Sequence, residues 1–271
     1  MYVLAQQPRS IGQVLDAAAQ LFKAAFVPLL PFSVVAGLVQ MLPAAFFLFA
    51  APGPGSEATQ AAQAAQMLNI VRSPFYWGGM VVLMLVNLIV YGAAIVRAES
   101  VAQTASMSAG QALDVGVRKC LIALVSSICF GLAVAVGLVL LIVPGLILLV
   151  SLIFGVTGIM LDDKGIISSL NYSHKLVWGN WWRTATLLTV GVIIVYVLFL
   201  IAALALGFTA GFLSSDRTVL MLVQFVSSGV ATFVVTPFFI ALMLEIYRDL
   251  KLRKEGGDLA GRLSSLQPAS R

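Results

Sequence analysis

Six long apolar runs dominate the chain and decide what it can fold into. The runs are Ala24–Ala50, Phe75–Ala98, Cys120–Val143, Leu146–Leu161, Ala185–Leu213 and Val219–Leu244. A bilayer core needs about 20 apolar residues per helix, so the runs predict an all-α, polytopic membrane protein with six transmembrane helices. Only 10% of the residues are charged, against about 25% in soluble domains. A soluble domain, a disordered chain and a nucleic-acid-binding domain are therefore excluded.

The connections between the runs predict how the helices end. Only Pro144–Gly145 separates the third run from the fourth. Proline stops a helix and glycine tolerates a positive φ, so we expect a tight helical hairpin at these two residues. The fourth run spans about 24 Å as a helix, less than the bilayer core. Ser56–Val71 is rich in Ala and Gln, and we expect a short helix there on the far side of the membrane.

The basic residues predict the orientation. With six crossings, 14 of the 16 Lys and Arg residues fall on the side of the two termini, and only Arg72 and Arg217 fall on the other. Cytoplasmic loops are enriched in Lys and Arg, so both termini are expected in the cytoplasm. The formal net charge of +5 is then mainly a topology signal. It predicts contact with anionic lipid headgroups on the cytoplasmic side and no nucleic-acid partner.

Two short segments repeat. Ser10–Asp16 and Ser108–Asp114 share five of seven residues, and in both a Gln follows the Ser by three positions, which is a capping box. The first continues to Lys23 with an apolar face and a polar face, as in a helix lying in the headgroup layer. A third, weaker copy begins at Asp163, which we expect to cap it, and continues to Trp182.

These segments predict three parallel repeats, each an amphipathic elbow helix followed by a transmembrane hairpin. The units cover about residues 9–98, 107–161 and 163–244 of a single membrane domain, residues 1–250. Residues 251–271 are expected to form a mobile cytoplasmic tail, with the last helix ending at Gly256–Gly257. The alternative is three unrelated juxtamembrane helices.

The segments Val143–Ile147, Leu161–Gly165 and Ser168–Asn180 resemble the bacterial inner-membrane YciC-like family. More distantly, they are similar to the membrane domain attached to some glycerophosphodiester phosphodiesterases. The resemblance implies the elbow-and-hairpin layout and a multi-pass location in the inner membrane. It implies no activity, because the YciC-like family is functionally uncharacterised and this chain has no counterpart of the phosphodiesterase domain.

Catalytic patterns are nearly missing from the sequence. His174 is the single histidine, and no Cys or carboxylate stands beside it at metal-ligand spacing. Phosphate-binding and nucleophile motifs are also missing. Asp162 and Asp163 are adjacent and so point to different sides of a helix, which favours capping over acid–base chemistry; the alternative is a pairing with Lys175 or Arg183. We therefore expect no enzyme, no cofactor and no metal.

Two groups of residues remain as candidate sites. The candidate lipid interface consists of Lys175, Trp178, Trp181, Trp182 and Arg183, because Trp and basic residues favour the headgroup layer. The candidate intramembrane polar residues are Gln40, Asn87 and Gln224. Such amides most often join helices to one another, and the alternative is that they contact a substrate.

Three functions remain open. The first is a non-enzymatic envelope scaffold or regulator with a membrane-protein partner or a second copy of the chain. The second is a protein that binds or moves lipids or other amphiphiles, and the third is a small-solute transporter. A solid core would favour the scaffold, a lateral groove the lipid and a polar midplane cavity the solute.

Overall fold

The computed structural model describes residues 2–50, 65, 68–213 and 217–266. Within these ranges, the side chains of residues 44–50, of 257–266 and of most of 202–231 lie outside the description. The described chain is all-α, as predicted. Its helices are α1 (Ile11–Ala50), α3 (Pro74–Ala102), α4 (Ala109–Leu140), α5 (Ile142–Leu152), α6 (Gly155–Asp162), α7 (Ile166–Val177), α8 (Trp181–Leu213) and α9 (Arg217–Leu266).

In the part of the chain that is described, five segments are long and apolar enough to cross a bilayer. They are Ile11–Pro43, Pro74–Ala102, Ala109–Leu140, Ile142–Asp162 and Trp181–Ile201. By helix length and hydropathy, the chain is a multi-pass membrane protein. The expected sixth span lies in α9, partly among residues whose side chains are not described. The expected helix over Ser56–Val71 also lies largely outside the described residues, although 68–72 are helical.

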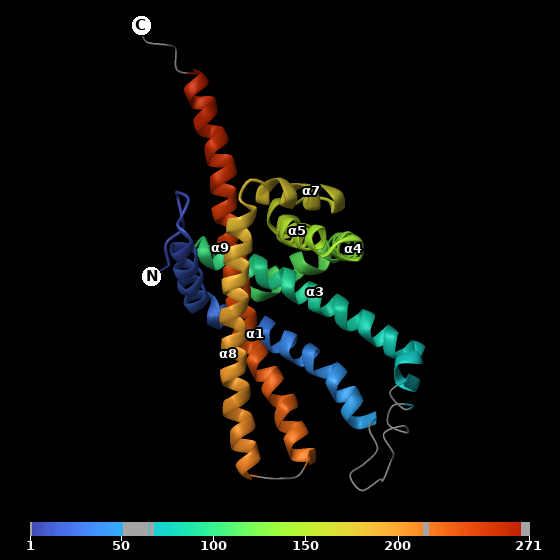
Figure 1. The fold of residues 1–271 in the computed structure, drawn as a ribbon. Helices are drawn as coiled ribbons and strands as arrows, with labels where there is room; N and C mark the ends of the chain where they lie inside the picture. The colour runs from blue at the N-terminus through green and yellow to red at the C-terminus, as the bar shows by residue number, and fades with distance from the viewer. Residues whose placement is uncertain (1, 51–64, 66–67, 214–216, 267–271) are drawn as a thin grey trace.

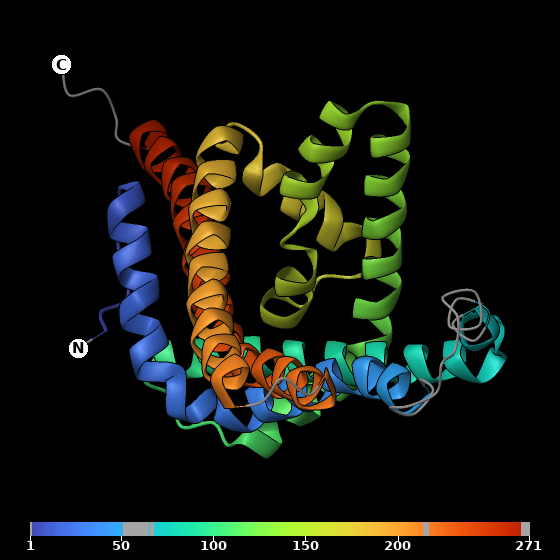
Figure 2. The same ribbon diagram turned by 60° about the horizontal axis from the view of Figure 1, so that its bottom comes forward.

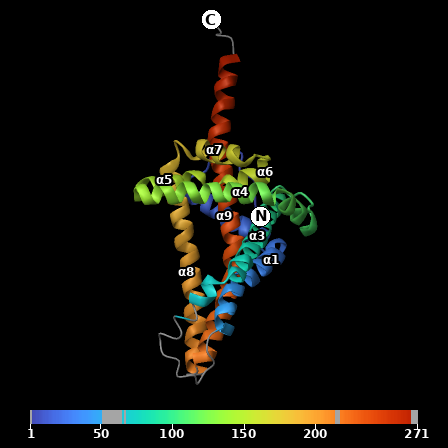
Figure 3. The same ribbon diagram turned by 90° about the vertical axis from the view of Figure 1, so that its right-hand side faces the viewer.

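Three antiparallel helix pairs diverge from one region of the molecule (Figure 1). The pairs are α1 with α3, α4 with α5, and α8 with α9, and further contacts join α1 to α9 and α3 to α4. Figure 3 shows α4 and α5 running across the direction of α8 and α9. The apolar core therefore lies where the pairs meet, around residues such as Leu29, Ala93 and Ile240.

Helix α1 bends sharply, so that its first turns lie at a steep angle to the rest (Figure 2). Pro28 and Pro31 lie inside the helix and remove two backbone donors, as a bend requires. The predicted capping box is present, since the amide of Ser10 donates to Gln13 at 2.8 Å and the amide of Gln13 donates to the Ser10 hydroxyl at 3.3 Å. The same reciprocal bonds join Ser108 and Gln111.

The apolar face of the first elbow exists, but it packs on protein. Val14 and Ala18 are buried in one cluster with Leu187 and Leu242, which belong to α8 and α9. The apolar face therefore contacts other helices, and the place of this helix in the headgroup layer stays a prediction. In the third elbow, α7, the buried stripe contains Ser169 and Ser173 together with Leu176 and Val177, because this helix also packs on the rest of the protein. Both elbows are thus structural supports for the core.

The hairpin between α4 and α5 turns at Leu141, not at Pro144–Gly145. Leu141 has extended φ and ψ angles and is the C-cap of α4 and the N-cap of α5. Pro144 lies in the first turn of α5, where a missing N–H is harmless. Gly145 allows close packing, because a Cβ there would lie 2.5 Å from the Leu138 side chain and 2.7 Å from its backbone nitrogen.

The expected fourth span is broken between α5 and α6. At the break, the amide of Phe154 donates to the Ser173 hydroxyl at 3.2 Å, and that hydroxyl donates to the carbonyl of Ser151 at 2.8 Å. Backbone groups at membrane depth need partners inside the protein. A single serine of α7 therefore supplies two of the bonds that a continuous helix would have made.

Asp163 does not cap the third elbow. It is the C-cap of α6, in the left-handed region with φ of 50°, whereas the N-cap of α7 is Gly165, with no side-chain cap bond. Lys119 hydrogen-bonds Asp163 and holds the pKa of that carboxyl below its usual value. Lys119 also donates to the carbonyls of Ile159 and Met160 at 3.0 and 2.9 Å.

The last helix is longer than expected. It continues through Gly256 and Gly257 to Leu266, so these glycines do not end it. A glycine inside a helix lowers helix stability by about 1 kcal/mol relative to alanine. This is too little by itself to stop a long helix.

We predict that Gly145→Ala destabilises the α4–α5 pair by about 1–3 kcal/mol, because its new methyl group overlaps backbone as well as side chain. Gly131→Ala on α4 is the matched control, since a Cβ there meets nothing within 4 Å. Unfolding in mixed detergent micelles measures both variants. Equal stability of the two would contradict the packing described for Gly145.

Candidate functional site

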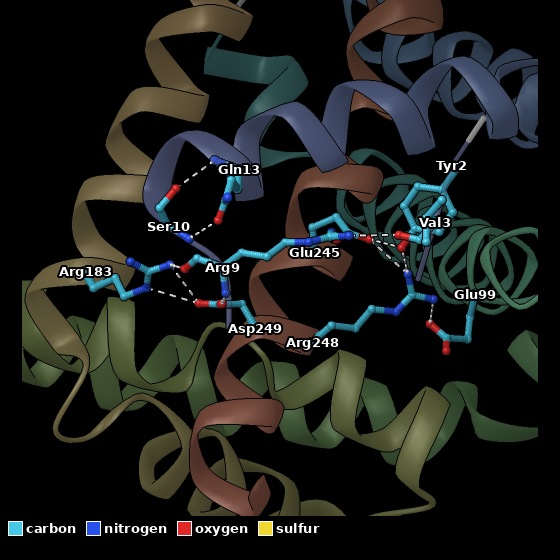
Figure 4. A network of polar contacts seen from close by, with 10 residues as sticks. All are labelled: Tyr2, Val3, Arg9, Ser10, Gln13, Glu99, Arg183, Glu245, Arg248 and Asp249. Atoms are coloured by element: carbon cyan, nitrogen blue, oxygen red, sulfur yellow. Dashed lines mark hydrogen bonds and ion pairs between the residues drawn. The ribbon is translucent and has the colours of Figure 1, made fainter. Parts of the chain in front are cut away.

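Charged side chains from the N-terminal segment, α3, α8 and α9 meet in one cluster (Figure 4). We call it the charged cluster; its members are Tyr2, Arg9, Glu99, Arg183, Glu245, Arg248, Asp249 and Arg253. At its centre, Glu245 and Asp249 lie one turn apart on α9, with side chains only 2% and 3% exposed. Buried carboxylates are stable only when they are paired, so their partners determine the geometry.

Glu245 joins the N-terminal segment to α3. Its carboxylate pairs with Arg9 and with Arg248, both at 2.9 Å, and accepts a hydrogen bond from the Tyr2 hydroxyl. Arg248 also pairs with Glu99 on α3 at 2.6 Å. Burial, followed by the bond to Glu245, raises the pKa of Tyr2, which keeps its hydroxyl a donor at neutral pH.

Asp249 joins the start of α1 to α8. It pairs with Arg183 at 3.0 Å and with Arg253 at 2.9 Å, and accepts from the amide of Arg9 at 2.8 Å. The carbonyl of Arg9 accepts from the same two guanidinium groups, at 2.5 and 2.7 Å. Both backbone groups of Arg9 are therefore held one residue before α1 is capped.

Asp162 anchors α6 to α9 in a neighbouring group. It accepts from Lys251 at 2.5 Å and from the hydroxyl of Tyr247. Burial, and next the bond to Asp162, raises the pKa of Tyr247. The expected alternative partners of Asp162 and Asp163, Lys175 and Arg183, are not the ones found. These pairs connect helices, and an arrangement of paired carboxylates and protonated phenols offers no free base.

The candidate lipid interface divides into two parts. Lys175, Trp178 and Trp182 are exposed, and the two tryptophan residues are 57% and 80% accessible. Trp181 packs inward and its Nε1 donates to the carbonyl of Ile147 at 3.3 Å. Arg183 belongs to the charged cluster. The sequence contains a signal for the place of Arg183 in the charged cluster. It is the pair of acids, Glu245 and Asp249, spaced four residues apart at the end of the last apolar run.

Gln40 and Asn87 come together in a groove of about 360 Å³ between α1 and α3. We call it the α1–α3 groove; its lining includes Gln40, Pro43, Met80, Met84, Asn87 and Tyr91. Both amide side chains are exposed. The spacing of Met80, Met84, Asn87 and Tyr91 places them on one face of α3. Gln224, the third expected intramembrane residue, lies outside the residues whose side chains are described.

A second groove of about 240 Å³ lies between α8 and α9, lined by residues such as Val192, Val195 and Phe199. Its surface is almost entirely apolar. Within the described residues, no group of three or more His, Cys, Asp or Glu side chains could hold a metal ion. The α1–α3 groove combines apolar walls with exposed amide side chains.

Residues 1–250 match the family described as a domain of unknown function, DUF7847, and the chain belongs to that family. Searches for similar proteins among curated proteins and among solved structures found no match. The family assignment covers all the charged residues just described except Arg253 and Lys251, which follow its end directly. The family description names no activity.

We predict that Asp249→Asn destabilises the protein by about 3–5 kcal/mol, because it leaves buried guanidinium groups without their carboxylate. Asp114→Asn is the control, since Asp114 pairs with Arg118 on the exposed surface of α4 and its loss is worth about 0.3–0.5 kcal/mol. Thermal unfolding in detergent compares the two. A similar small loss in both variants would show that Asp249 does not hold the cluster together.

Proposed function

We propose that this protein binds a lipid or another amphiphile in the membrane. The observation that carries the proposal is the α1–α3 groove, in which Gln40 and Asn87 interrupt an apolar lining. A site of this composition suits a molecule with an apolar body and a small polar part. The apolar lining favours an amphiphile over a small solute, which would need a hydrated path.

The lack of hydrogen-bond partners for the two amide side chains among the described residues supports the same conclusion. No hydrogen bond from Gln40 or Asn87 to another described residue is present, and both side chains are exposed. An amide without partners in hydrocarbon is costly. A bound molecule with hydrogen-bonding atoms would remove that cost and gain affinity from it.

The proposed setting is a six-span protein of the bacterial inner membrane, with three elbow-and-hairpin units and both termini in the cytoplasm. The sixth span is the apolar part of α9. The two capping boxes and the three diverging helix pairs support the three units. The resemblance of Val143–Asn180 to the YciC-like family supports a location in the bacterial inner membrane. The charge distribution supports the orientation.

Lys175, Trp178 and Trp182 are proposed to contact anionic headgroups on the cytoplasmic side. The three side chains are exposed, and none of them takes part in the charged cluster. Indole rings and ammonium groups both favour this layer, with about 1 kcal/mol for each basic residue near an anionic surface.

A non-enzymatic scaffold remains the second candidate. The charged cluster supports it, because its buried ion pairs fix four separate segments without leaving a reactive group. A scaffold acts through a membrane-protein partner or a second copy of the chain. Crosslinking in native membranes should then give a defined partner or dimer, and a purely monomeric product would remove this candidate.

We predict that Met84→Trp, which fills the α1–α3 groove, lowers the amount of amphiphile that co-purifies with the protein at least several-fold. Val82→Trp is the matched control, because Val82 is also exposed on α3 (58%) and does not line the groove. Mass spectrometry of extracted lipids measures the stoichiometry. If both variants retain the wild-type amount, the groove is not the binding site and the proposal fails.

We predict that a reporter fused after Arg271 is cytoplasmic and that one inserted between Ser214 and Arg217 is external. The reason is the excess of basic residues on the side of the termini. An alkaline phosphatase and fluorescent-protein pair measures each position. External activity at Arg271 would overturn the orientation without affecting the groove.

A further inference from the structure

The α1–α3 groove lies at the middle of α3, one of the candidate membrane spans. Asn87 stands midway along α3 between Trp77, near the outer end, and Arg97, near the charged cluster. Each half covers about 15 Å at 1.5 Å per residue, and together they match the hydrocarbon thickness of about 30 Å. Gln40 lines the same groove and so lies at a similar depth.

The groove offers hydrogen bonds but no charge. None of its described lining residues is ionised at neutral pH, and three of them carry polar groups: Gln40, Asn87 and Tyr91. The carbonyl of Val39 is a further acceptor, because Pro43, one turn later, has no N–H to donate to it. Along α3, the nearest cation is Arg97, ten positions and more than two helical turns from Asn87.

The charge of the ligand follows from this. A phosphate or carboxylate placed at the middle of the bilayer without a cation would carry a large desolvation penalty. An uncharged head with carbonyl or hydroxyl oxygens meets no such penalty. It can accept from the amide groups of Gln40 and Asn87 and donate to their oxygens.

We propose that the occupant of the α1–α3 groove is a neutral lipid, one whose polar head is uncharged and presents carbonyl or hydroxyl oxygens. Met80 and Met84 line the groove on the same face of α3 as the amide. Their flexible side chains adapt to an apolar chain of irregular shape. This inference rests on the proposed function and adds the chemical class of the ligand.

The test uses two probes with the same acyl chains, dioctanoylglycerol and dioctanoyl phosphatidylglycerol, which differ in the charge of the head. Binding to the full-length protein in detergent is measured by native mass spectrometry. The neutral probe is expected to bind at least tenfold more tightly. Asn87→Leu should weaken its binding roughly threefold to tenfold, as expected for one lost hydrogen bond, and should reduce the preference for the neutral head.

Thr189→Val is the control for the Asn87 variant, because Thr189 is exposed on α8 and is not part of the groove. Its binding should equal that of the wild type. Equal affinity for the two probes, with Met84→Trp weakening both, would overturn the neutral head and leave the proposed function intact. If Met84→Trp lowers the binding of neither probe, both the neutral head and the proposed function are overturned. Tighter binding of the anionic probe would also overturn the neutral head.

Discussion

Two buried carboxylates on α9, Glu245 and Asp249, join the last two helices to the start of α1 and, through Arg248, to α3. Inside a bilayer the hydrophobic effect does not drive helices toward one another, since lipid tails are as apolar as leucine. Ionised groups away from water need partners, and their loss costs several kcal/mol. Because the partners come from the N-terminal segment, α3 and α8, satisfying two carboxylates fixes the ends of three elements. The rest of each helix pair can then extend in its own direction.

The same ion pairs hold the helix ends from which the two walls of the α1–α3 groove extend. Arg9 is held through its amide, carbonyl and guanidinium groups, and this fixes where α1 starts. Glu99, near the C-terminal end of α3, is held by Arg248. This contact fixes one end of the second wall of the groove. The two walls are thus positioned by polar contacts at one end, while Gln40 and Asn87 lie farther along them. The bend of α1 at its prolines carries the second half of the helix to α3, and the groove is the space left between them.

The features that depend on neighbouring residues could be predicted from the sequence. Both capping boxes are formed by residues three apart, and the buried face of the first elbow follows a local periodicity. Two of the expectations that failed depend on contacts between distant residues. The break after α5 is stabilised by Ser173, 19 positions from Phe154. Asp163 is drawn away from α7 by Lys119 on α4. No local pattern contains these partners.

The candidate site was predicted in part. Gln40 and Asn87 stood out because polar residues are rare in apolar runs, but their common groove required the packing of α1 on α3. Tyr91 carried a usable signal, its spacing of four from Asn87. Arg183 was grouped with its tryptophan neighbours because they are adjacent in the chain, and its carboxylate partner lies 66 positions away.

The sequence by itself determined that this chain is a helical, multi-pass membrane protein, because apolar length and the need to satisfy backbone hydrogen bonds in lipid leave no other solution. It also determined where two helices begin. Only the tertiary structure decided which cations meet Glu245 and Asp249, where the fourth apolar run breaks, and that two isolated amides share one groove. Those outcomes depend on three-dimensional distances between residues far apart in the chain, and a one-dimensional pattern contains no such distances.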